Sequence, residues 1–322
     1  MSTATAIAHP NIALVKYWGK RDSVLNLPAT GSLSMTLDIF PTTTTVTLDD
    51  AAERDSLVLN GDERTDGPAE RVSRFLDIVR ALAGSSARAR VETVNTVPSA
   101  AGLASSASGF AALAVAAAAA YGLDLDTRAL SRLARRGSGS ASRSIIPGFA
   151  IWHAGEDDES SFAEPLDAPE LAMVVAMVEK REKAVSSREA MRRTVLTSPF
   201  YPAWVSSTAE SLEAAADASR AGDVERLGRI TEVNALRMHA LIQSCDPPIR
   251  YLNPVSVEIF DRVAALRESG VDAWATADAG PNVVVLTEPD SVDAVTAALT
   301  GLAELAVARP GPAAALVTRA DG

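Results

Sequence analysis

The chain has 322 residues, a formal net charge of −11, 47% hydrophobic residues and 22% charged residues. This composition is that of an ordinary globular protein and excludes intrinsic disorder for most of the chain. The acidic balance argues against nucleic acid as the main partner, because a phosphate backbone needs a basic face. An anionic ligand would therefore bind at a local cluster of Lys and Arg.

The number of cysteines and the length of the apolar runs exclude further classes of protein. The single cysteine, Cys245, excludes an internal disulfide, and with only three histidines the chain lacks a Cys/His zinc site. Residues 1–8 lack the basic start and the apolar core of a secretory signal. The most apolar run, residues 110–121, is shorter than the roughly 20 residues of a membrane span. We expect a soluble, cytoplasmic protein.

The N-terminal half combines short strand-like runs with helical periodicity. Strands are expected over residues 3–18 (with a bend at Pro10), 32–40, 42–48, 56–59, 88–94 and 145–153. Asn60-Gly61 predicts a hairpin turn. Helices are expected over residues 70–83, with an end at Gly84, and over 108–121 and 127–136.

The second half has no steady alternation of strand and helix. We expect a strand over 171–178, three or four helices between 187 and 270, a strand pair over 272–276 and 282–287, a helix over 290–302 and a final strand over 314–318. The acidic, turn-rich segment 155–170 indicates a boundary between an N-terminal lobe, 1–168, and a C-terminal lobe, 169–322. This mixed order favours an α+β fold over a doubly wound sheet.

The segment from Pro98 to Ser106 leads from a strand into the apolar helix. Its small residues allow a close approach of the backbone to a ligand, and the free N–H groups of a helix N-terminus favour phosphate. It is not a Walker A loop, because no Gly-Lys-Ser/Thr follows. The pattern alone fits a phosphate-binding loop and a capped core helix equally well.

Two other segments carry cationic or hydroxyl side chains next to expected tight turns. Asn11 to Asp22 carries Lys16, Lys20 and Arg21. A lysine that faces inward there needs a carboxylate or a ligand phosphate, whereas a solvated turn is the simpler interpretation of Lys20 and Arg21. Gly137 to Arg143 fits either a phosphate cradle, whose arginine holds a carboxylate, or a flexible linker.

The second half contributes two more candidates. Lys183 to Arg188 joins cations and hydroxyls just before a helix. Asp278 ends an apolar strand, and Gly280-Pro281 turns the chain into the next strand. A turn aspartate is the commoner interpretation, and a general base beside a basic cleft is the alternative.

Together these segments resemble the diphosphomevalonate decarboxylase family of the GHMP kinase superfamily. The blocks that carry the resemblance are residues 13–22, 98–109, 137–143 and 278–282, in the order of the family. Lys-Tyr-Trp-Gly-Lys and Asp-Ala-Gly-Pro-Asn are specific to the decarboxylases. The resemblance implies a two-lobed GHMP-kinase-type fold, in which a cleft separates an N-terminal lobe like domain 2 of ribosomal protein S5 from a ferredoxin-like C-terminal lobe.

The implied activity is ATP-dependent decarboxylation of (R)-5-diphosphomevalonate to isopentenyl diphosphate through 3-hydroxyl phosphorylation, with Mg²⁺ and in a homodimer. The alternatives are an enzyme for 5-phosphomevalonate, a kinase that only phosphorylates the 3-hydroxyl, and a non-catalytic nucleotide-binding regulator. Asp278, Lys16 and Arg143 argue against the kinase, and a regulator would have lost such residues. Arg188 and Lys20 favour a diphosphate.

The resemblance also implies roles for individual residues. Asp278 is the expected catalytic carboxylate, Lys16 lies beside it, and Arg143 binds the carboxylate that leaves as CO₂. The expected substrate contacts are Tyr17, Lys20, Ser138, Ser140, Ser187 and Arg188. The expected nucleotide contacts are Asn95, Ser99, Gly102, Ser105 and Ser106, and Ser106 is also the expected Mg²⁺ ligand. No role is given to His239.

The sequence departs from the family in two places. Thr30-Gly31-Ser32 stands where many members carry Asn-Ser-Ser, which removes an amide and a hydroxyl. Ser99 stands where threonine is usual, which is a mild change. The first departure affects substrate binding if the amide and the hydroxyl that are missing from this segment contact the substrate in other members.

Overall fold

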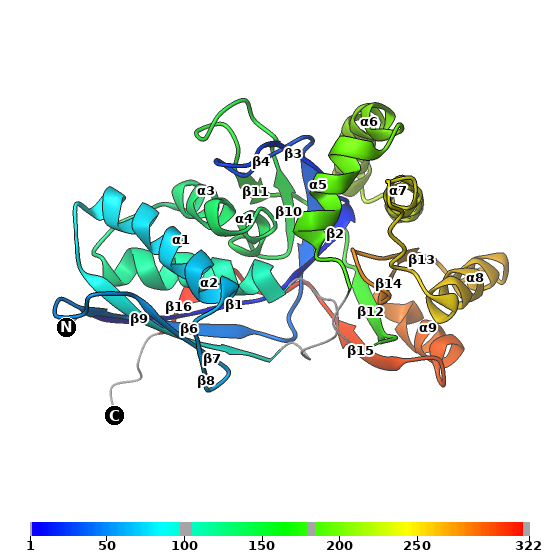
Figure 1. Ribbon diagram of the computed structural model, residues 1–322. Helices are drawn as coiled ribbons and strands as arrows, with labels where there is room; N and C mark the ends of the chain where they lie inside the picture. The colour runs from blue at the N-terminus through cyan, green and yellow to red at the C-terminus, as the bar shows by residue number, and fades with distance from the viewer. Residues whose placement is uncertain (1, 97–104, 180–183, 318–322) are drawn as a thin grey trace.

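The computed structural model describes residues 2–96, 105–179 and 184–317, and it has the α+β organisation that the sequence predicts. Figure 1 shows a long sheet beneath helices at the N-terminal end, a second sheet in the middle, and a third sheet with its own helices at the far end. The segments that carry charges and hydroxyls lie around the middle sheet.

The first sheet has six strands in the order β16-β1-β6-β9-β7-β8. These strands are β1 Thr3–Ala8, β6 Thr42–Asp49, β7 Ser56–Leu59, β8 Asp62–Arg64, β9 Arg88–Asn95 and β16 Ala315–Leu316. Neighbouring strands are antiparallel except β7 and β9. Because β16 pairs with β1, the chain returns near its C-terminal end to a sheet built from the N-terminal half.

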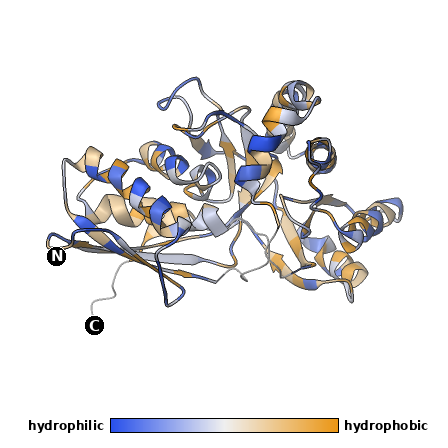
Figure 2. Ribbon diagram, in the orientation of Figure 1, coloured by the Kyte–Doolittle hydropathy of each residue, from blue (hydrophilic) through white to orange (hydrophobic). Residues whose placement is uncertain are grey.

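Helices cover one face of this sheet (Figure 1). They are α1 Gly67–Ala83, α2 Ser105–Ala120, α3 Thr127–Gly137 and the short α4 Ala141–Ser144. Helix α2 is apolar on nearly every side, as Figure 2 shows, and its alanines pack closely on β1 and β6. None of the helices in the described part of the chain combines the length and apolar character needed to cross a bilayer.

Two local sequence signals act as expected. Gly84 takes the left-handed conformation, with φ 59°, and ends α1 by donating its N–H to the carbonyl of Arg80. Asn60 and Gly61 both have positive φ, and they form the turn between β7 and β8. These predictions are confirmed because each depends on backbone geometry within a few residues.

The middle and third sheets are antiparallel and have four strands each, in the orders β11-β10-β5-β2 and β13-β14-β12-β15. The middle strands are β2 Asn11–Val15, β5 Ser32–Thr36, β10 Phe149–Trp152 and β11 Ala163–Pro165. The third sheet contains β12 Ala172–Met177, β13 Ala273–Thr276, β14 Val283–Thr287 and β15 Glu304–Ala308. A small pair, β3 Lys20–Asp22 and β4 Leu27–Pro28, stands beside the middle sheet.

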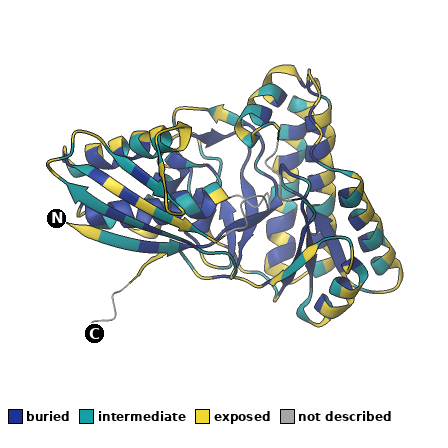
Figure 3. Cartoon of the chain, turned by 60° about the horizontal axis from the view of Figure 1, so that its bottom comes forward, coloured by how far each residue is buried: buried dark blue, intermediate teal, exposed yellow. Residues whose placement is uncertain are grey.

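The remaining helices belong to the second half of the chain. They are α5 Ser187–Thr197, α6 Tyr201–Ala221, α7 Val224–Gln243, α8 Pro254–Glu268 and α9 Val292–Leu299. One apolar core joins Leu33 and Met35 of the middle sheet to Val175 and Leu286 of the third sheet. Figure 3 shows these buried strands at the centre and exposed residues on the outer helices. The two halves of the chain therefore share a core.

The structure corrects two expectations and adds one strand that was not expected. The expected strand over 145–153 is limited to β10, because Pro147 and Gly148 (φ 57°) form a turn. The strand preference of the two isoleucines before that turn is too weak to extend the strand. The expected helix over 290–302 ends at Leu299, and the unexpected strand β15 follows it. That strand is a half-exposed edge of its sheet, and its short run of residues carries no alternating pattern.

We predict that Gly228→Ala destabilises the fold. An added Cβ on Gly228 of α7 would lie 2.0 Å from Cδ2 of the buried Trp274, whereas one on Gly109 of α2 would meet nothing within 4 Å. Overpacking costs about 1–3 kcal/mol, while Gly→Ala in an open helical position gains about 0.5–1 kcal/mol. The free energy of unfolding in urea should fall for Gly228→Ala and not for the control Gly109→Ala. Equal stability of the two variants would contradict the packing argument.

Candidate active site

A buried ion pair lies where strands from the two halves of the chain end. Lys16 follows β2, and its Nζ lies 2.7 Å from Oδ1 of Asp278 and 2.7 Å from the carbonyl oxygen of Ala13. Lys16 is 1% exposed, and the side chain of Asp278 is 28% exposed. Burial lowers the pKa of Lys16, and the adjacent Asp278 carboxylate opposes that shift. The pair thus presents a carboxylate to the site with a cation fixed behind it.

Helix α7 supports both members of this pair. Oδ1 of Asn234 accepts a hydrogen bond of 2.8 Å from the backbone N–H of Lys16. His239 donates from Nε2 to the carbonyl of Ala277 at 3.3 Å. Burial and the nearby Lys16 ammonium lower the pKa of His239 to about 4, so its imidazole is neutral at pH 7. No role is predicted for these residues from the sequence, because helical periodicity does not reveal which strand end a helix face meets.

Arg143 on α4 lies close to the pair and is nearly fully buried. Its Nε and one terminal nitrogen donate to Oδ1 of Asn11 at 3.3 and 3.0 Å, and the other terminal nitrogen donates to Oγ of Ser32 at 2.6 Å. Burial lowers the pKa of Arg143 to about 10, and Asp278 opposes that shift. The guanidinium is held rigidly, with one N–H on each terminal nitrogen left for a ligand.

Asn11 and Ser32 are contacts that the sequence analysis missed. Asn11 is a polar residue in an otherwise apolar strand, and its Nδ2 also donates to the carbonyl of Ser140 and to Oγ of Ser144. A single amide side chain in a buried strand needs hydrogen-bond partners, and this signal could have identified Asn11 as a site residue. Ser32 begins β5, directly after the two residues at which the chain departs from the family pattern, and its hydroxyl contacts Arg143.

A row of hydroxyls connects the N-terminal end of α2 to the Gly137–Ser140 turn. Oγ of Ser138 donates to Oγ of Ser106 at 3.2 Å and lies 3.4 Å from Oγ of Ser140. The structure therefore brings together two segments that the sequence assigned to different ligands. Two polyphosphates bound at these segments would face each other across this row.

Tyr17 and Gly139 meet beside the row. A Cβ on Gly139 would lie 2.8 Å from Oη of Tyr17, so only glycine allows this approach. The Tyr17 hydroxyl is buried and has no hydrogen-bond partner among the described residues. Burial raises the pKa of Tyr17, so the hydroxyl stays protonated and can donate to a ligand oxygen.

A group of cations from three different elements lines a cavity. Lys20 from β3 and Arg188 from α5 line one cavity of about 650 Å³, together with Arg71 from α1. Burial and the charges of Arg188 and Arg71 lower the pKa of Lys20 to about 8. Ser187 begins α5 next to Arg188 and is half-buried. Arg71 was missed because its partners in this cluster come from distant segments.

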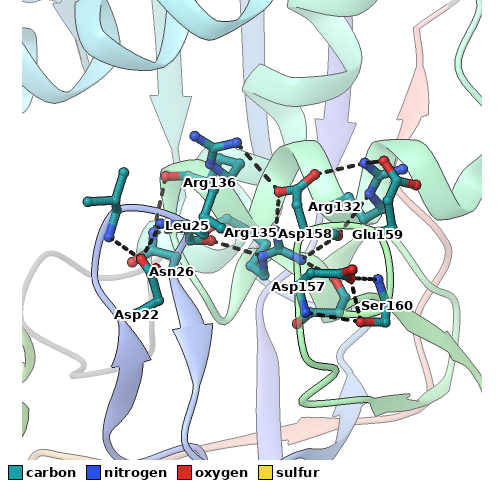
Figure 4. A network of polar contacts seen from close by, with 12 residues as sticks. Asp22, Leu25, Asn26, Arg132, Arg135, Arg136, Asp157, Asp158, Glu159 and Ser160 are labelled. Atoms are coloured by element: carbon teal, nitrogen blue, oxygen red, sulfur yellow. Dashed lines mark hydrogen bonds and ion pairs between the residues drawn. The ribbon is translucent and has the colours of Figure 1, made fainter.

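Asn26 ties Lys20 to the C-terminal end of α3, and Figure 4 shows its contacts with that helix end. It takes a left-handed conformation with φ 56°, accepts a hydrogen bond from Nζ of Lys20 at 2.5 Å, and donates to the carbonyls of Arg135 and Arg136 at 2.9 and 3.0 Å. The fully buried Arg135 in turn donates to the carbonyl of Leu25 and pairs with Asp158. This network holds the β3–β4 pair against α3 and thereby sets the position of Lys20.

A second cavity of about 200 Å³ adjoins the hydroxyl row. Asn95, Ser105 and Ser106 line it, with apolar side chains such as Leu57 and Phe110. Oδ1 of Asn95 accepts a hydrogen bond of 3.2 Å from Oγ1 of Thr42. Of the other expected nucleotide contacts, Ser99 and Gly102 lie outside the described residues, as does Lys183.

A divalent cation fits the donors at this place. The described residues contain no group of three His, Cys, Asp or Glu side chains that could hold a metal ion by themselves. Mg²⁺ keeps several waters and takes substrate phosphate oxygens as ligands, so one or two protein oxygens suffice. Ser106, whose Oγ contacts Ser138, offers such a hard oxygen donor.

Comparisons with known proteins agree with this arrangement. Residues 8–163 match the Diphosphomevalonate decarboxylase-like N-terminal domain, and residues 173–308 match the Mevalonate 5-diphosphate decarboxylase C-terminal domain. The diphosphomevalonate decarboxylase of Ganoderma lucidum is 38% identical over 90% of this chain and 79% of its own length. The human enzyme is 37% identical over 93% and 80%, respectively.

Solved structures show the same fold. The mevalonate diphosphate decarboxylase of Staphylococcus aureus has a TM-score of 0.95 and 41% identity, over 98% of each chain. A structure of MDDEF in complex with MVAPP, AMPPCP and magnesium has a TM-score of 0.94 and 45% identity, over 98% of this chain and 99% of that one. With both of its halves matched at these levels of identity, the chain belongs to the diphosphomevalonate decarboxylase family.

Proposed function

We propose that the protein catalyses the ATP-dependent decarboxylation of (R)-5-diphosphomevalonate to isopentenyl diphosphate, CO₂, ADP and phosphate, a step of the mevalonate pathway. The observation that carries the proposal is the Lys16–Asp278 ion pair beside Arg143. Family membership supports the reaction, since relatives carry the name of this enzyme and one was solved with MVAPP, AMPPCP and magnesium.

Arg143 binds the substrate carboxylate. Its guanidinium is fixed by Asn11 and Ser32, and the two N–H groups that remain match the geometry of a carboxylate. A carboxylate held there lies near Asp278, because Arg143 is bound to Asn11 of β2 and Lys16, the partner of Asp278, directly follows that strand. This contact orients the bond that breaks when CO₂ leaves.

Asp278 acts at the 3-hydroxyl of the substrate. Its carboxylate accepts the hydrogen bond of that hydroxyl and directs the oxygen toward the γ-phosphoryl group, while Lys16 holds the carboxylate in place by a hydrogen bond of 2.7 Å. Departure of the new phosphate leaves positive charge at C3, which the fixed negative charge of Asp278 stabilises. Loss of CO₂ then supplies the electron pair that forms the alkene.

The nucleotide phosphates lie at the start of α2 and the substrate diphosphate lies among the cations. Ser105 and Ser106 contact the nucleotide, and Asn95 lines the pocket for the rest of it. Tyr17, Lys20, Ser138, Ser140, Ser187 and Arg188 surround the diphosphate. Mg²⁺, held by Ser106 and by phosphate oxygens, would neutralise charge on the transferring phosphoryl group.

We further propose the organisation expected from the sequence. The lobes are 1–168 and 169–322, and the sheets support this division because β12 to β15 all follow residue 168, with β16 as the strand that returns. The cytoplasmic location and the homodimer rest on the composition and on the family resemblance.

The direct test supplies ATP·Mg²⁺ with either 5-diphosphomevalonate or 5-phosphomevalonate and measures CO₂ and ADP separately. Equal amounts of both products from the diphosphate, at a kcat/KM well above that for the monophosphate, are expected. Lys20, Arg71 and Arg188 give the physical reason, since a second phosphate adds contacts to charged groups. Preference for the monophosphate would favour the sister enzyme, and ADP without CO₂ would favour a 3-kinase.

We predict that Asp278→Asn lowers kcat for CO₂ release by about 10²–10⁴-fold, because a positioned acid–base group contributes about that much. Binding of ATP and of substrate, measured by calorimetry, should persist. Asp272→Asn is the matched control, since Asp272 is an exposed carboxylate just before the same strand. Decarboxylation by Asp278→Asn within tenfold of the wild type would exclude the assigned role.

The charge of Lys20 should give substrate binding a pH dependence. Below pH 8 Lys20 carries its proton, and above it the free enzyme loses this charge, so KM for the diphosphate substrate should rise by roughly tenfold between pH 7 and pH 9.5. Lys20→Arg keeps a charge throughout and should remove the rise. A rise of the same size in Lys20→Arg would show that another group is responsible.

A further inference from the structure

The cavity of about 650 Å³ extends beyond the groups that react. It opens between α1 and α5, beside the turn from β3 to β4. Asp278, Lys16, Arg143 and Ser106 do not line it, although Lys20 and Arg188 do. A substrate whose carboxylate lies at Arg143 reaches this cavity only with its diphosphate end. The nucleotide pocket is separate, and among the described residues only Arg71 lines both cavities.

Cationic side chains form part of the cavity lining. Arg74, Arg136 and Arg192 line the cavity and pair with Glu70, Asp158 and Glu189, respectively. Within the described part of the chain, Lys20 and Arg71 have no carboxylate partner, and Nε of Arg71 is buried without a hydrogen-bond partner. Burial and the charge of Arg188 lower the pKa of Arg71 to about 10. Lys20 and Arg71 are therefore available to hold an anion.

The apolar walls of the cavity consist of Val24, Phe75, Ile78, Met191, Val195 and Leu196. Val24 is 78% exposed and Leu196 is 67% exposed, so these side chains hold apolar surface in water at the mouth. A diphosphate alone would contact the cations and leave these walls uncovered. The lining as a whole matches an anion that carries an apolar chain.

We propose that this cavity binds a diphosphate monoester with an apolar chain, which places its phosphates at Lys20, Arg71 and Arg188 and its chain along Val24, Met191 and Leu196. Such a ligand occupies the diphosphate subsite. The expectation that it competes with substrate rests on the proposed function. The expectation that it binds rests only on the cavity and its charges, which are present whether or not the protein turns over substrate. The protein would thereby sense a soluble amphiphilic diphosphate through its own substrate site.

The test measures binding of inorganic diphosphate and of butyl, octyl and dodecyl diphosphate to the full chain by calorimetry, without nucleotide. Burial of each methylene group should tighten binding by about threefold to fourfold until the walls are covered. Octyl diphosphate is therefore expected to bind at least tenfold more tightly than butyl diphosphate. The same series should inhibit decarboxylation competitively against the diphosphate substrate, in the same order.

Two variants separate the cavity from general hydrophobic binding. Val24→Ser/Leu196→Ser removes the apolar mouth at two exposed positions and should abolish most of the chain-length effect, while inorganic diphosphate binds as before. Leu82→Ser is the matched control, because Leu82 is an exposed leucine on α1 that does not line the cavity. It should keep the full effect.

Three outcomes would overturn the proposal. They are affinities that do not change with chain length, a chain-length effect that persists in the double variant, and sedimentation of the protein with phosphatidic acid vesicles in place of binding to free alkyl diphosphates. The last outcome would assign the apolar mouth to a membrane surface. Failure of inhibition alone, with chain-dependent binding intact, would contradict the proposed substrate subsite and leave the cavity assignment standing.

Discussion

The buried contact between Lys16 and Asp278 is the constraint on which the site depends. The two residues are 262 positions apart, and their charges meet at 2.7 Å where little solvent reaches. A buried ammonium without a partner would cost several kcal/mol, so the end of β2 and the turn that follows β13 have to meet. Asn234 and His239 hold both strand ends from α7. A catalytic geometry that needs two halves of a chain is thus fixed by a pair that also stabilises their contact.

Buried arginines serve two different purposes in this fold. Arg135 is fully buried, and Asp158 neutralises its charge. Its other N–H groups donate hydrogen bonds to carbonyl oxygens and hold the turn that carries Asn26. Arg143 is buried just as deeply, but its bonds go to the neutral side chains of Asn11 and Ser32. A buried guanidinium held only by neutral groups keeps its charge available. The difference in partners separates a structural arginine from one suited to bind a carboxylate.

The groups that we propose to bind phosphate form two adjoining sites. The hydroxyls of Ser106, Ser138 and Ser140 connect the start of α2 to the turn beside Tyr17, and Arg71 lines the cavities on both sides. An acidic chain that binds two polyphosphates has few cations to neutralise much negative charge, so a cation that lines both cavities can act on both ligands. It also means that an anion in the larger cavity affects the charge felt by both reactants.

The sequence by itself determined what depends on neighbours along the chain. Asn60-Gly61 set a hairpin, Gly84 ended a helix, and the all-round apolar character of α2 placed it in a core, because each follows from local backbone geometry or composition. The resemblance further marked Lys16, Arg143 and Asp278. Only the tertiary structure decided which groups these residues meet. Asn11, Arg71 and Asn234 find their contacts 66 to 218 positions away, so no local pattern encodes them, and β15 became a strand because β12 offered it an edge.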